Sequence, residues 1–253
     1  MKYIILALSA LMFLAMPAMG QDVTFGDFLP PVENSATGKI IQMVVLLTVL
    51  SVAPGLLIMV TSFTRIIVAL SFLRSGMGLQ TTPANLILIS LALFMTFFIM
   101  GPTTDKAWQN GIKPMMEDKI SQAQAYENVV QPFRRFMLDQ VRAKDIHMFQ
   151  DLASKSFGRE NKDEKARNGK SDKIDLRILI PAFMISELRR GFEIGFLIVL
   201  PFLVIDLVVA TITMSMGMMM LPPTVISLPF KILFFILIDG WNLLVGGLVR
   251  SFF

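Results

Sequence analysis

The sequence predicts an all-α membrane protein, with four long hydrophobic helices in hairpins and a periplasmic helical region. Hydrophobic residues make up 54% of the 253 residues, and the mean hydropathy is +0.65, whereas soluble domains are about 45–50% apolar. Of the 23 basic and 19 acidic residues, 27 lie within residues 105–177. The rest of the sequence is almost free of charge, which is typical of membrane segments on either side of one polar region.

The residue types exclude several classes of function. The chain contains no cysteine, so disulfides, thiolate metal sites and cysteine nucleophiles are excluded. The single histidine, His147, has no second histidine with which to share a metal, and no GxSxG, HExxH or phosphate-binding glycine motif occurs. The polar region mixes 15 basic with 12 acidic residues and has no basic stripe with interleaved aromatic residues. We therefore expect no enzyme activity, no cofactor, no metal and no nucleic-acid partner.

The first 20 residues predict a signal peptide. Lys2 precedes an apolar run at residues 4–16, and small residues at Ala18 and Gly20 suit cleavage between Gly20 and Gln21. The alternative is a short membrane helix that stays attached. That run has only 13 residues, however, and a membrane helix needs about 20.

Residues 40–102 predict a first helical hairpin. A polar lead-in at residues 21–39 contains Pro30-Pro31, which prevents regular helix. Residues 40–60 are free of charge and long enough to cross a bilayer, with a kink expected at Pro54-Gly55. A second charge-free run at residues 84–100 is expected to end at Gly101-Pro102.

The topology follows from the connection between these two runs. Residues 61–83 contain two arginines and no acid, so the positive-inside rule places them in the cytoplasm. Residues 103–177 are then periplasmic, which agrees with a signal peptide. This region predicts short helices, one capped by Thr104 and others starting at Pro114 and Pro132. Within it, residues 158–173 are polar without periodicity and predict a solvated linker.

Residues 178–253 predict a second helical hairpin with a methionine-rich loop. An apolar segment at residues 178–196 carries four charges, and a run at residues 196–220 follows it, about 37 Å long as a helix. Pro222-Pro223 turn the chain, and residues 224–249 form the fourth run. We expect all four runs to be helical, because a helix satisfies its own backbone polar groups in lipid.

Ionisable residues in these apolar segments must face a partner or a wet cavity. Glu187 and Arg190 are three residues apart, and Arg189 and Glu193 are four apart, so each pair can close along one helix. We predict a buried charge network formed by Arg65, Glu187, Arg189, Arg190, Glu193, Asp206, Lys231 and Asp239. The network either only joins the helices or takes a direct part in transport.

The register of the second hairpin predicts that Asp206 does not pair with Lys231. A hairpin folded about residues 222–223 places Asp206 level with Asp239 and leaves Lys231 about 12 Å away along the helix axis. We therefore expect Asp206 to meet a base on another helix or subunit, with Arg65 as a candidate.

Methionine is concentrated just before the double proline. The positions are Met214, Met216, Met218, Met219 and Met220. Methionine side chains are flexible and apolar, so a ring of them could seal a pore and deform around a passing chain. The alternative is that these side chains fill a helix interface or face lipid.

A small-residue motif lies earlier in the same hairpin. Gly191 and Gly195 are four residues apart, so they lie on one helix face. We expect this face to approach another helix closely.

The second half of the sequence contains two long and specific motifs. The first is Pro181-Ala-Phe-Met-Ile-Ser-Glu-Leu-Arg-Arg-Gly-Phe-Glu-Ile-Gly-Phe196, and the second is Pro201-Phe-Leu-Val-Ile-Asp-Leu207 followed by Met218-Met-Met-Leu-Pro-Pro223. Leu228-Pro-Phe-Lys231, Asp239-Gly-Trp241 and Thr64-Arg-Ile66 accompany them. Together these motifs resemble the signatures of the FliP family of flagellar biosynthetic proteins. The resemblance extends from about residue 40 to the end of the chain, apart from the linker at residues 158–173.

The resemblance implies a core subunit of the type III export apparatus, in the bacterial inner membrane at the flagellar basal body. It implies a ring-like homo-oligomer, expected to be a pentamer, that assembles with FliQ, FliR and other export-apparatus membrane proteins. It also implies that the hydrophobic hairpins pack on each other and can sit raised from the bilayer plane. The methionine-rich segment would then be a gasket in the pore, and Met216 stands where some relatives carry another apolar residue.

We therefore predict a passive conduit for unfolded flagellar protein substrates. Its energy must come from elsewhere, because the sequence has no nucleotide-binding loop. The alternative is a polytopic transporter subunit for a small solute. Such a protein needs a polar site at mid-membrane depth, which Asp206 and Asp239 could supply.

Overall fold

The computed structural model describes residues 58–79, 83–157, 174–217 and 222–253, together with single positions between 43 and 55. The chain divides into two units, residues 1–53 and 54–253. In the first unit the described positions are helical, and the Thr48 hydroxyl donates to the Val44 carbonyl at 2.8 Å. Several predicted features lie outside the described residues: the signal peptide with Gly20 and Gln21, the lead-in at 21–39, most of the run at 40–60, the linker at 158–173, and Met218, Met219 and Met220.

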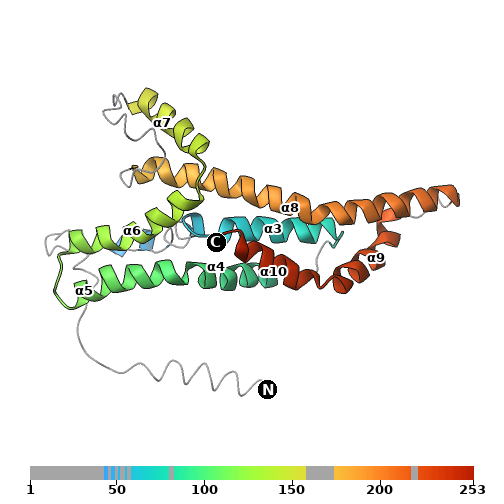
Figure 1. The fold of residues 1–253 in the computed structure, drawn as a ribbon, viewed down its shortest axis with the longest axis horizontal. Helices are drawn as coiled ribbons and strands as arrows, with labels where there is room; N and C mark the ends of the chain where they lie inside the picture. Colours follow the sequence, from blue (N-terminus) through green and yellow to red (C-terminus); the bar gives the residue numbers. More distant parts are fainter. Residues whose placement is uncertain are drawn as a thin grey trace, which may run out of the picture. The chain divides into compact units, whose positions relative to one another are not determined.

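The second unit is helical and has no strand among its described residues (Figure 1). Two continuous helical segments, Asn85–Met116 and Leu176–Ser215, are long and apolar enough to cross a membrane, and a bent pair of helices could form a third span. The prediction of an all-α protein with membrane-length helices is therefore confirmed. Its helices are α3 (Phe63–Gly76), α4 (Asn85–Ala107), the π-helix η2 (Trp108–Ile112), α5 (Lys113–Met116), α6 (Gln122–Gln140), α7 (Ala143–Phe157), α8 (Leu176–Ser215), α9 (Pro223–Leu237) and α10 (Gly240–Arg250).

Helix α8 organises the second unit, because α3, α6, α7 and α9 all pack against it. It is 40 residues long, or about 60 Å at 1.5 Å per residue. The two segments expected on either side of Phe196 are thus one continuous helix. The main core lies between α3, α4 and α10, where Ile66, Leu70 and Leu248 are buried.

Helix α4 shows that the prediction of a helix end at Gly101-Pro102 was wrong. The helix continues through Pro102 to Ala107 and leads into η2. A proline removes only one backbone donor, and membrane-type helices accommodate this loss. Thr104 does not cap a helix, because its hydroxyl donates to the carbonyls of Met100 and Gly101 at 3.1 and 2.9 Å inside α4.

The prediction that a helix starts at Pro132 was also wrong, since Pro132 lies inside α6. Helix α6 begins after Ser121, whose hydroxyl accepts from the Gln124 backbone while the Gln124 side chain accepts from the Ser121 backbone. This capping box satisfies two backbone donors that a helix start leaves free. Pro114, in contrast, lies in the first turn of α5, as predicted.

The fourth predicted run is broken rather than straight. Helices α9 and α10 meet at an angle of 65°. Asp239 between them has a φ of +51°, a left-handed conformation that aspartate tolerates better than most residues. A Cβ at Gly240 would lie 2.3 Å from the Phe235 ring, so only glycine allows this tight bend.

Candidate functional site

Helix α8 ends within the methionine-rich segment, and its last turn carries Met214 and leads into Met216. Helix α8 ends at Ser215, and Gly217 follows with a φ of +75° while its N–H donates to the Met214 carbonyl at 3.1 Å. A left-handed glycine of this kind is a common helix ending. The side chains of Met214 and Met216 are 65% and 68% exposed. The tip of the hairpin therefore presents soft apolar groups outward.

Asp206 pairs with Lys231 inside this hairpin, so the prediction that these two residues do not pair was wrong. The Lys231 Nζ lies 2.5 Å from Asp206 Oδ2, and the Ser227 hydroxyl donates to Asp206 Oδ1 at 2.5 Å. The prediction assumed that the helix continues to Pro222. Helix α8 instead ends at Ser215, and α9 starts at Pro223. Asp206 and Lys231 then lie about 13.5 and 12 Å from the adjoining helix ends, and so at the same level.

Lys231 also joins the hairpin to α3. Its Nζ donates to the Gly76 carbonyl at 3.0 Å, at the last residue of α3. Carbonyls at a helix C-terminus lack helical partners and carry partial negative charge, so an ammonium group there is favourable. We name Asp206, Ser227, Lys231 and the Gly76 carbonyl the Asp206 cluster. This cluster joins three helices at one partly buried point.

A second cluster forms around Arg65 on α3. Arg65 and Glu187 are both 0% exposed. The Arg65 guanidinium donates two bonds to the Glu187 carboxylate, one of them from Nε to Oε2 at 2.9 Å, a bidentate arrangement that is strong and specific in geometry. The expected partner on the same helix, Arg190, is not the one that Glu187 uses. Glu187 lies on the face of α8 that packs against α3, where Arg65 is the nearest base.

The remaining donors of Arg65 hold the end of the chain. Arg65 Nη1 donates to the Ser251 carbonyl at 2.8 Å and to its hydroxyl at 3.0 Å, and Nη2 donates to Gln140 Oε1 at 2.9 Å. The guanidinium carbon lies 3.7 Å from the centroid of the Phe252 ring, within the range of a cation–π contact. We name Arg65, Glu187, Gln140, Ser251 and Phe252 the Arg65 cluster. Sequence reasoning missed the last three residues, because local spacing contains no signal for contacts across 75 and 186 positions.

The other charged residues of the predicted network lie at the surface of the single chain, where Arg189, Glu193 and Asp239 are exposed and Arg190 is half-buried. Arg189 and Glu193 pair across one turn of α8, with Nε and Oε1 at 2.8 Å. Asp239 accepts from the Asn242 amide at 3.1 Å near the α9–α10 bend. The predicted network is therefore divided into the buried Arg65 cluster, the partly buried Asp206 cluster and a set of charges at the surface.

Gly191 and Gly195 lie where α8 crosses α3. A Cβ at Gly191 would lie 3.0 Å from Val68 Cβ, and one at Gly195 would lie 2.6 Å from the Phe72 ring. Both distances are shorter than ordinary van der Waals contact, so the two helix backbones approach more closely than larger residues would allow.

Gly195→Ala is therefore expected to destabilise the protein by about 1–3 kcal/mol, because the added methyl group overpacks the contact with Phe72. Thermal unfolding of the purified protein in detergent measures this loss. Gly246→Ala in α10 is the matched control, since a Cβ there has no neighbour within 4 Å among the residues that the structure describes. Equal melting temperatures for the two variants would contradict the close approach.

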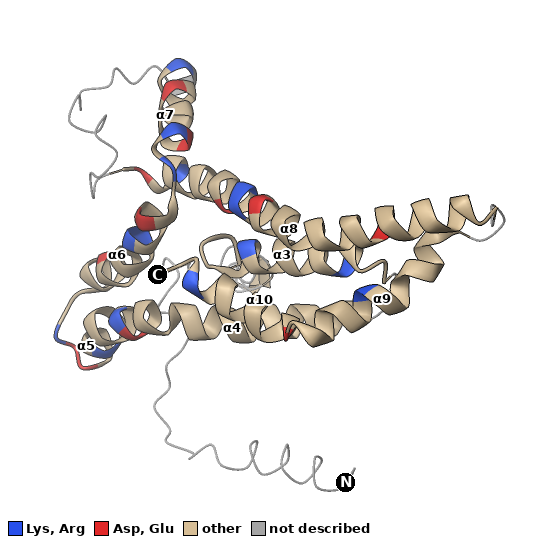
Figure 2. Cartoon of the chain, turned by 45° about the vertical axis from the view of Figure 1, so that its right-hand side comes forward, with Lys and Arg blue, Asp and Glu red and all other residues tan. Residues whose placement is uncertain are grey.

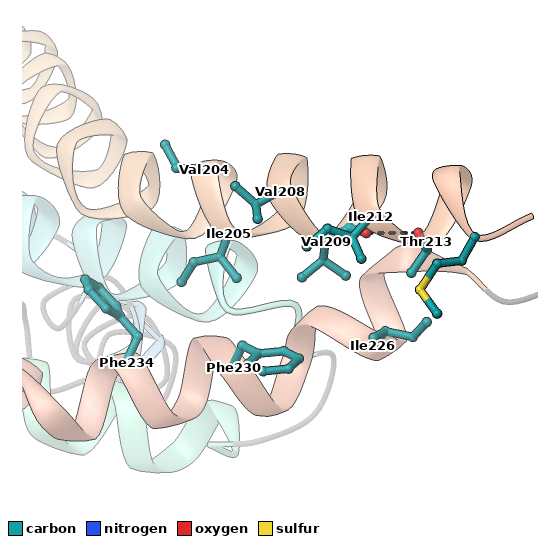
Figure 3. Close-up of a pocket in the computed structure, with 10 residues that line it drawn as sticks. Val204, Ile205, Val208, Val209, Ile212, Thr213, Ile226, Phe230 and Phe234 are labelled. Carbon is teal, nitrogen blue, oxygen red and sulfur yellow. Dashed lines mark hydrogen bonds between the residues drawn. The ribbon is translucent and has the colours of Figure 1, made fainter. Parts of the chain in front are cut away.

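An apolar groove of about 610 Å³ runs between α8 and α9 (Figure 3). Val208 and Ile212 of α8 line one side, and Ile226 and Phe230 of α9 line the other. Among the described lining residues, Thr213 has the only hydroxyl, and it donates back to the Val209 carbonyl at 2.9 Å. Among the residues that the structure describes, no group of His, Asp or Glu could hold a metal ion.

Membrane-length helices, buried ion pairs that join them and an exposed apolar hairpin tip define a helical membrane subunit. The FliP family model matches residues 46–248, and the chain belongs to this family. It is 62% identical over 222 residues to the flagellar biosynthetic protein FliP of Rhizobium meliloti (strain 1021), covering 88% of this chain and 87% of that protein. The FliP proteins of Agrobacterium fabrum and Bacillus subtilis (strain 168) are 57% and 49% identical, covering 94% and 84% of this chain and 95% and 91% of their own lengths.

Membership of this family confirms two predictions made from the sequence. The resemblance to FliP was correct, and it extends over most of the chain. The protein is a non-enzymatic component of flagellum biogenesis and protein export rather than a catalyst.

Proposed function

We propose that the chain is a core subunit of the flagellar type III protein-export gate in the inner membrane, where it forms part of the conduit for unfolded flagellar substrates. The observation that carries the proposal is the exposed hairpin tip with Met214 and Met216, at the end of a long apolar helix in a FliP-family chain. These methionines, with Met218, Met219 and Met220 after them, would close the conduit at rest. Their flexible side chains would then yield to a passing polypeptide.

The exposed surface of the second unit supports assembly with other chains. Large apolar side chains are exposed along α4, α8 and α9, among them Phe94, Leu207 and Leu237. A soluble monomer does not expose this much apolar surface. Lipid alone would not suit the exposed Arg189–Glu193 pair, because charges avoid the hydrocarbon layer. We propose that several copies, five in number, form a ring together with FliQ, FliR and other export-apparatus membrane proteins.

A transporter for a small solute fits these observations less well. Its polar site was to come from Asp206 and Asp239, but Asp206 is already occupied by Ser227 and Lys231. Asp239 lies at the α9–α10 bend, beyond the last residue of α9. The groove between α8 and α9 is apolar, so it suits a polar solute poorly.

Replacing both Met214 and Met216 with alanine is expected to raise ion leakage across the membrane severalfold, because alanine is too short to close the conduit. The measurement is membrane conductance in cells that produce the variant together with the other gate subunits. Met148→Ala, an exposed methionine on α7, is the control and should leave the conductance unchanged.

Unchanged leakage in a fully assembled complex would contradict the sealing role of these methionines. The wider proposal is tested separately by a deletion strain, which should lose both motility and secretion of flagellar substrates. If secretion continued while uptake of a small solute was lost, the transporter would replace the export gate.

A further inference from the structure

Helix α8 continues well beyond the helix that supports it. The two helices still touch at Val199, whose Cγ2 would lie 2.8 Å from a Cβ at Gly76, the last residue of α3. From Val199 to Ser215 the helix extends for about another 24 Å, and Figure 1 shows α9 below this part, beyond the end of α3. We name residues 202–215 of α8 and 223–228 of α9 the outer hairpin.

The outer hairpin has few tertiary contacts. Its buried side chains in α8 are those of Phe202, Val209 and Thr213, and in α9 its one buried side chain is Ser227. Parts of a protein with few buried contacts move most easily relative to the rest. The outer hairpin carries Met214, so a movement of this part would displace the methionine-rich segment while the core around α3 stayed folded.

A proline lies inside each helix where the outer hairpin begins. Pro201 is in α8, just beyond the contact with α3, and Pro229 is in α9, two residues before Lys231. The rings of Phe202 and Phe234 meet edge to face with their centroids 6.3 Å apart, so the two helices lie side by side at this level. Proline has no backbone N–H and its ring crowds the preceding turn, so a helix bends more easily there.

One ionic bond crosses the level of the two prolines. Lys231 lies on the inner side of its proline and donates to the Gly76 carbonyl of α3 at 3.0 Å. Its carboxylate partner, Asp206, lies on the outer side of Pro201. These two are the only charged residues in α9 and in α8 beyond Glu193 (Figure 2). Without this bond the outer hairpin would be held by apolar contacts, which have little directionality.

We propose that the outer hairpin tilts as one unit about Pro201 and Pro229, and that Lys231 is the latch that holds it to the end of α3. Ser215 lies 14 residues beyond Pro201, about 21 Å along the helix. A change of about 20° in the bend, the size of a proline kink, therefore moves the end of α8 by about 7 Å. The inference rests on the proposed function, because it supplies the movement that would open the conduit.

The tilt is measured as a distance between two spin labels. The sequence has no cysteine, so Ser75→Cys at the end of α3 and Ser215→Cys at the end of α8 each accept one label, and both positions are exposed. The labelled full chain is assembled with the other gate subunits and an excess of the cysteine-free wild-type chain, so that labelled copies do not meet. Pulsed electron paramagnetic resonance should give a broad distribution of distances.

Pro201→Ala with Pro229→Ala restores both backbone donors, so it should narrow this distribution and lower the secretion of flagellar substrates severalfold. Its melting temperature should be no lower than that of wild type, because alanine suits a helix better than proline does. Pro181→Ala, in the inner part of α8 beside buried core residues, is the matched control and should change neither measurement. Lys231→Met should broaden the distribution, because it opens the latch.

Equal distance distributions for the double-proline variant and the control overturn the proposal. A loss of secretion with an unchanged distribution, or a melting temperature below that of wild type, also overturns it, since the prolines would then serve packing. An unchanged distribution in Lys231→Met overturns the role of the latch. None of these results alters the secretion defect of the deletion strain or the leakage expected from the Met214 and Met216 substitutions, so failure of the hinge is distinguishable from failure of the export-gate proposal.

Discussion

Glu187→Gln is expected to lower the free energy of unfolding by about 3–5 kcal/mol, because it leaves the guanidinium of Arg65 buried without a counter-charge. Both side chains are fully buried in the Arg65 cluster, so water cannot replace the lost carboxylate. Ser251 and Gln140 supply only neutral acceptors to Arg65. Denaturant or thermal unfolding in detergent measures the loss, and a marked fall in cellular abundance should accompany it.

The control for this prediction is the exposed ion pair on the same helix. Glu193→Gln removes the charge that pairs with Arg189 at the surface of the chain, where such ion pairs contribute about 1 kcal/mol or less. A second variant, Arg65→Met with Glu187→Met, removes both buried charges and should be less destabilised than Glu187→Gln alone. If Glu187→Gln and Glu193→Gln lost equal stability, the buried pair would not stabilise the folded protein as its geometry indicates.

The Arg65 cluster also holds the end of the chain. Phe252 stacks on the Arg65 guanidinium, and its carbonyl accepts from the Gln140 amide at 3.2 Å. The Arg65 cluster therefore joins α3, α6, α8 and the segment after α10 through one buried side chain. A cluster of this kind fixes the register of helices that apolar packing alone would leave free to slide, because apolar contacts have little directionality.

The helical class could be predicted from the sequence because it depends on local hydropathy. Long charge-free runs need helices to satisfy the backbone in lipid, and α4 and α8 are such helices. The break at Asp239 was missed, since the run at residues 224–249 is mostly apolar and has only two charged residues, Lys231 and Asp239. The bend depends on the left-handed conformation of Asp239 and on the close approach of Gly240 to the Phe235 ring, and hydropathy carries no information about either.

Two errors had local signals that a closer reading could have used. Ser121 and Gln124 have the spacing of a capping box and marked the start of α6. Gly217 marked the end of α8, as a left-handed glycine often does, and using it would have placed Asp206 level with Lys231. The pairing of Arg65 with Glu187 had no local signal, because 122 positions separate the two residues.

Lys231→Met is expected to destabilise the protein by about 1.5–3 kcal/mol, because it removes a charged donor from two acceptors at once. Asp206 would keep only the Ser227 hydroxyl, and the Gly76 carbonyl at the end of α3 would lose its partner. Thermal unfolding in detergent again measures the effect. Since the Asp206 cluster joins the α8–α9 hairpin to α3, the variant should also increase proteolysis within the hairpin.

A charge swap tests whether the pairing itself is responsible. Asp206→Lys with Lys231→Asp should be more stable than either single reversal, because the ion pair is restored with its ends exchanged. Rescue should be incomplete, since an aspartate at position 231 cannot donate to the Gly76 carbonyl. The swap of Asp206 with Arg65 should give no rescue, because Arg65 is already held by Glu187. If that second swap rescued and the first did not, Asp206 would find its functional partner outside the hairpin, and the pair with Lys231 would be incidental to the assembled protein.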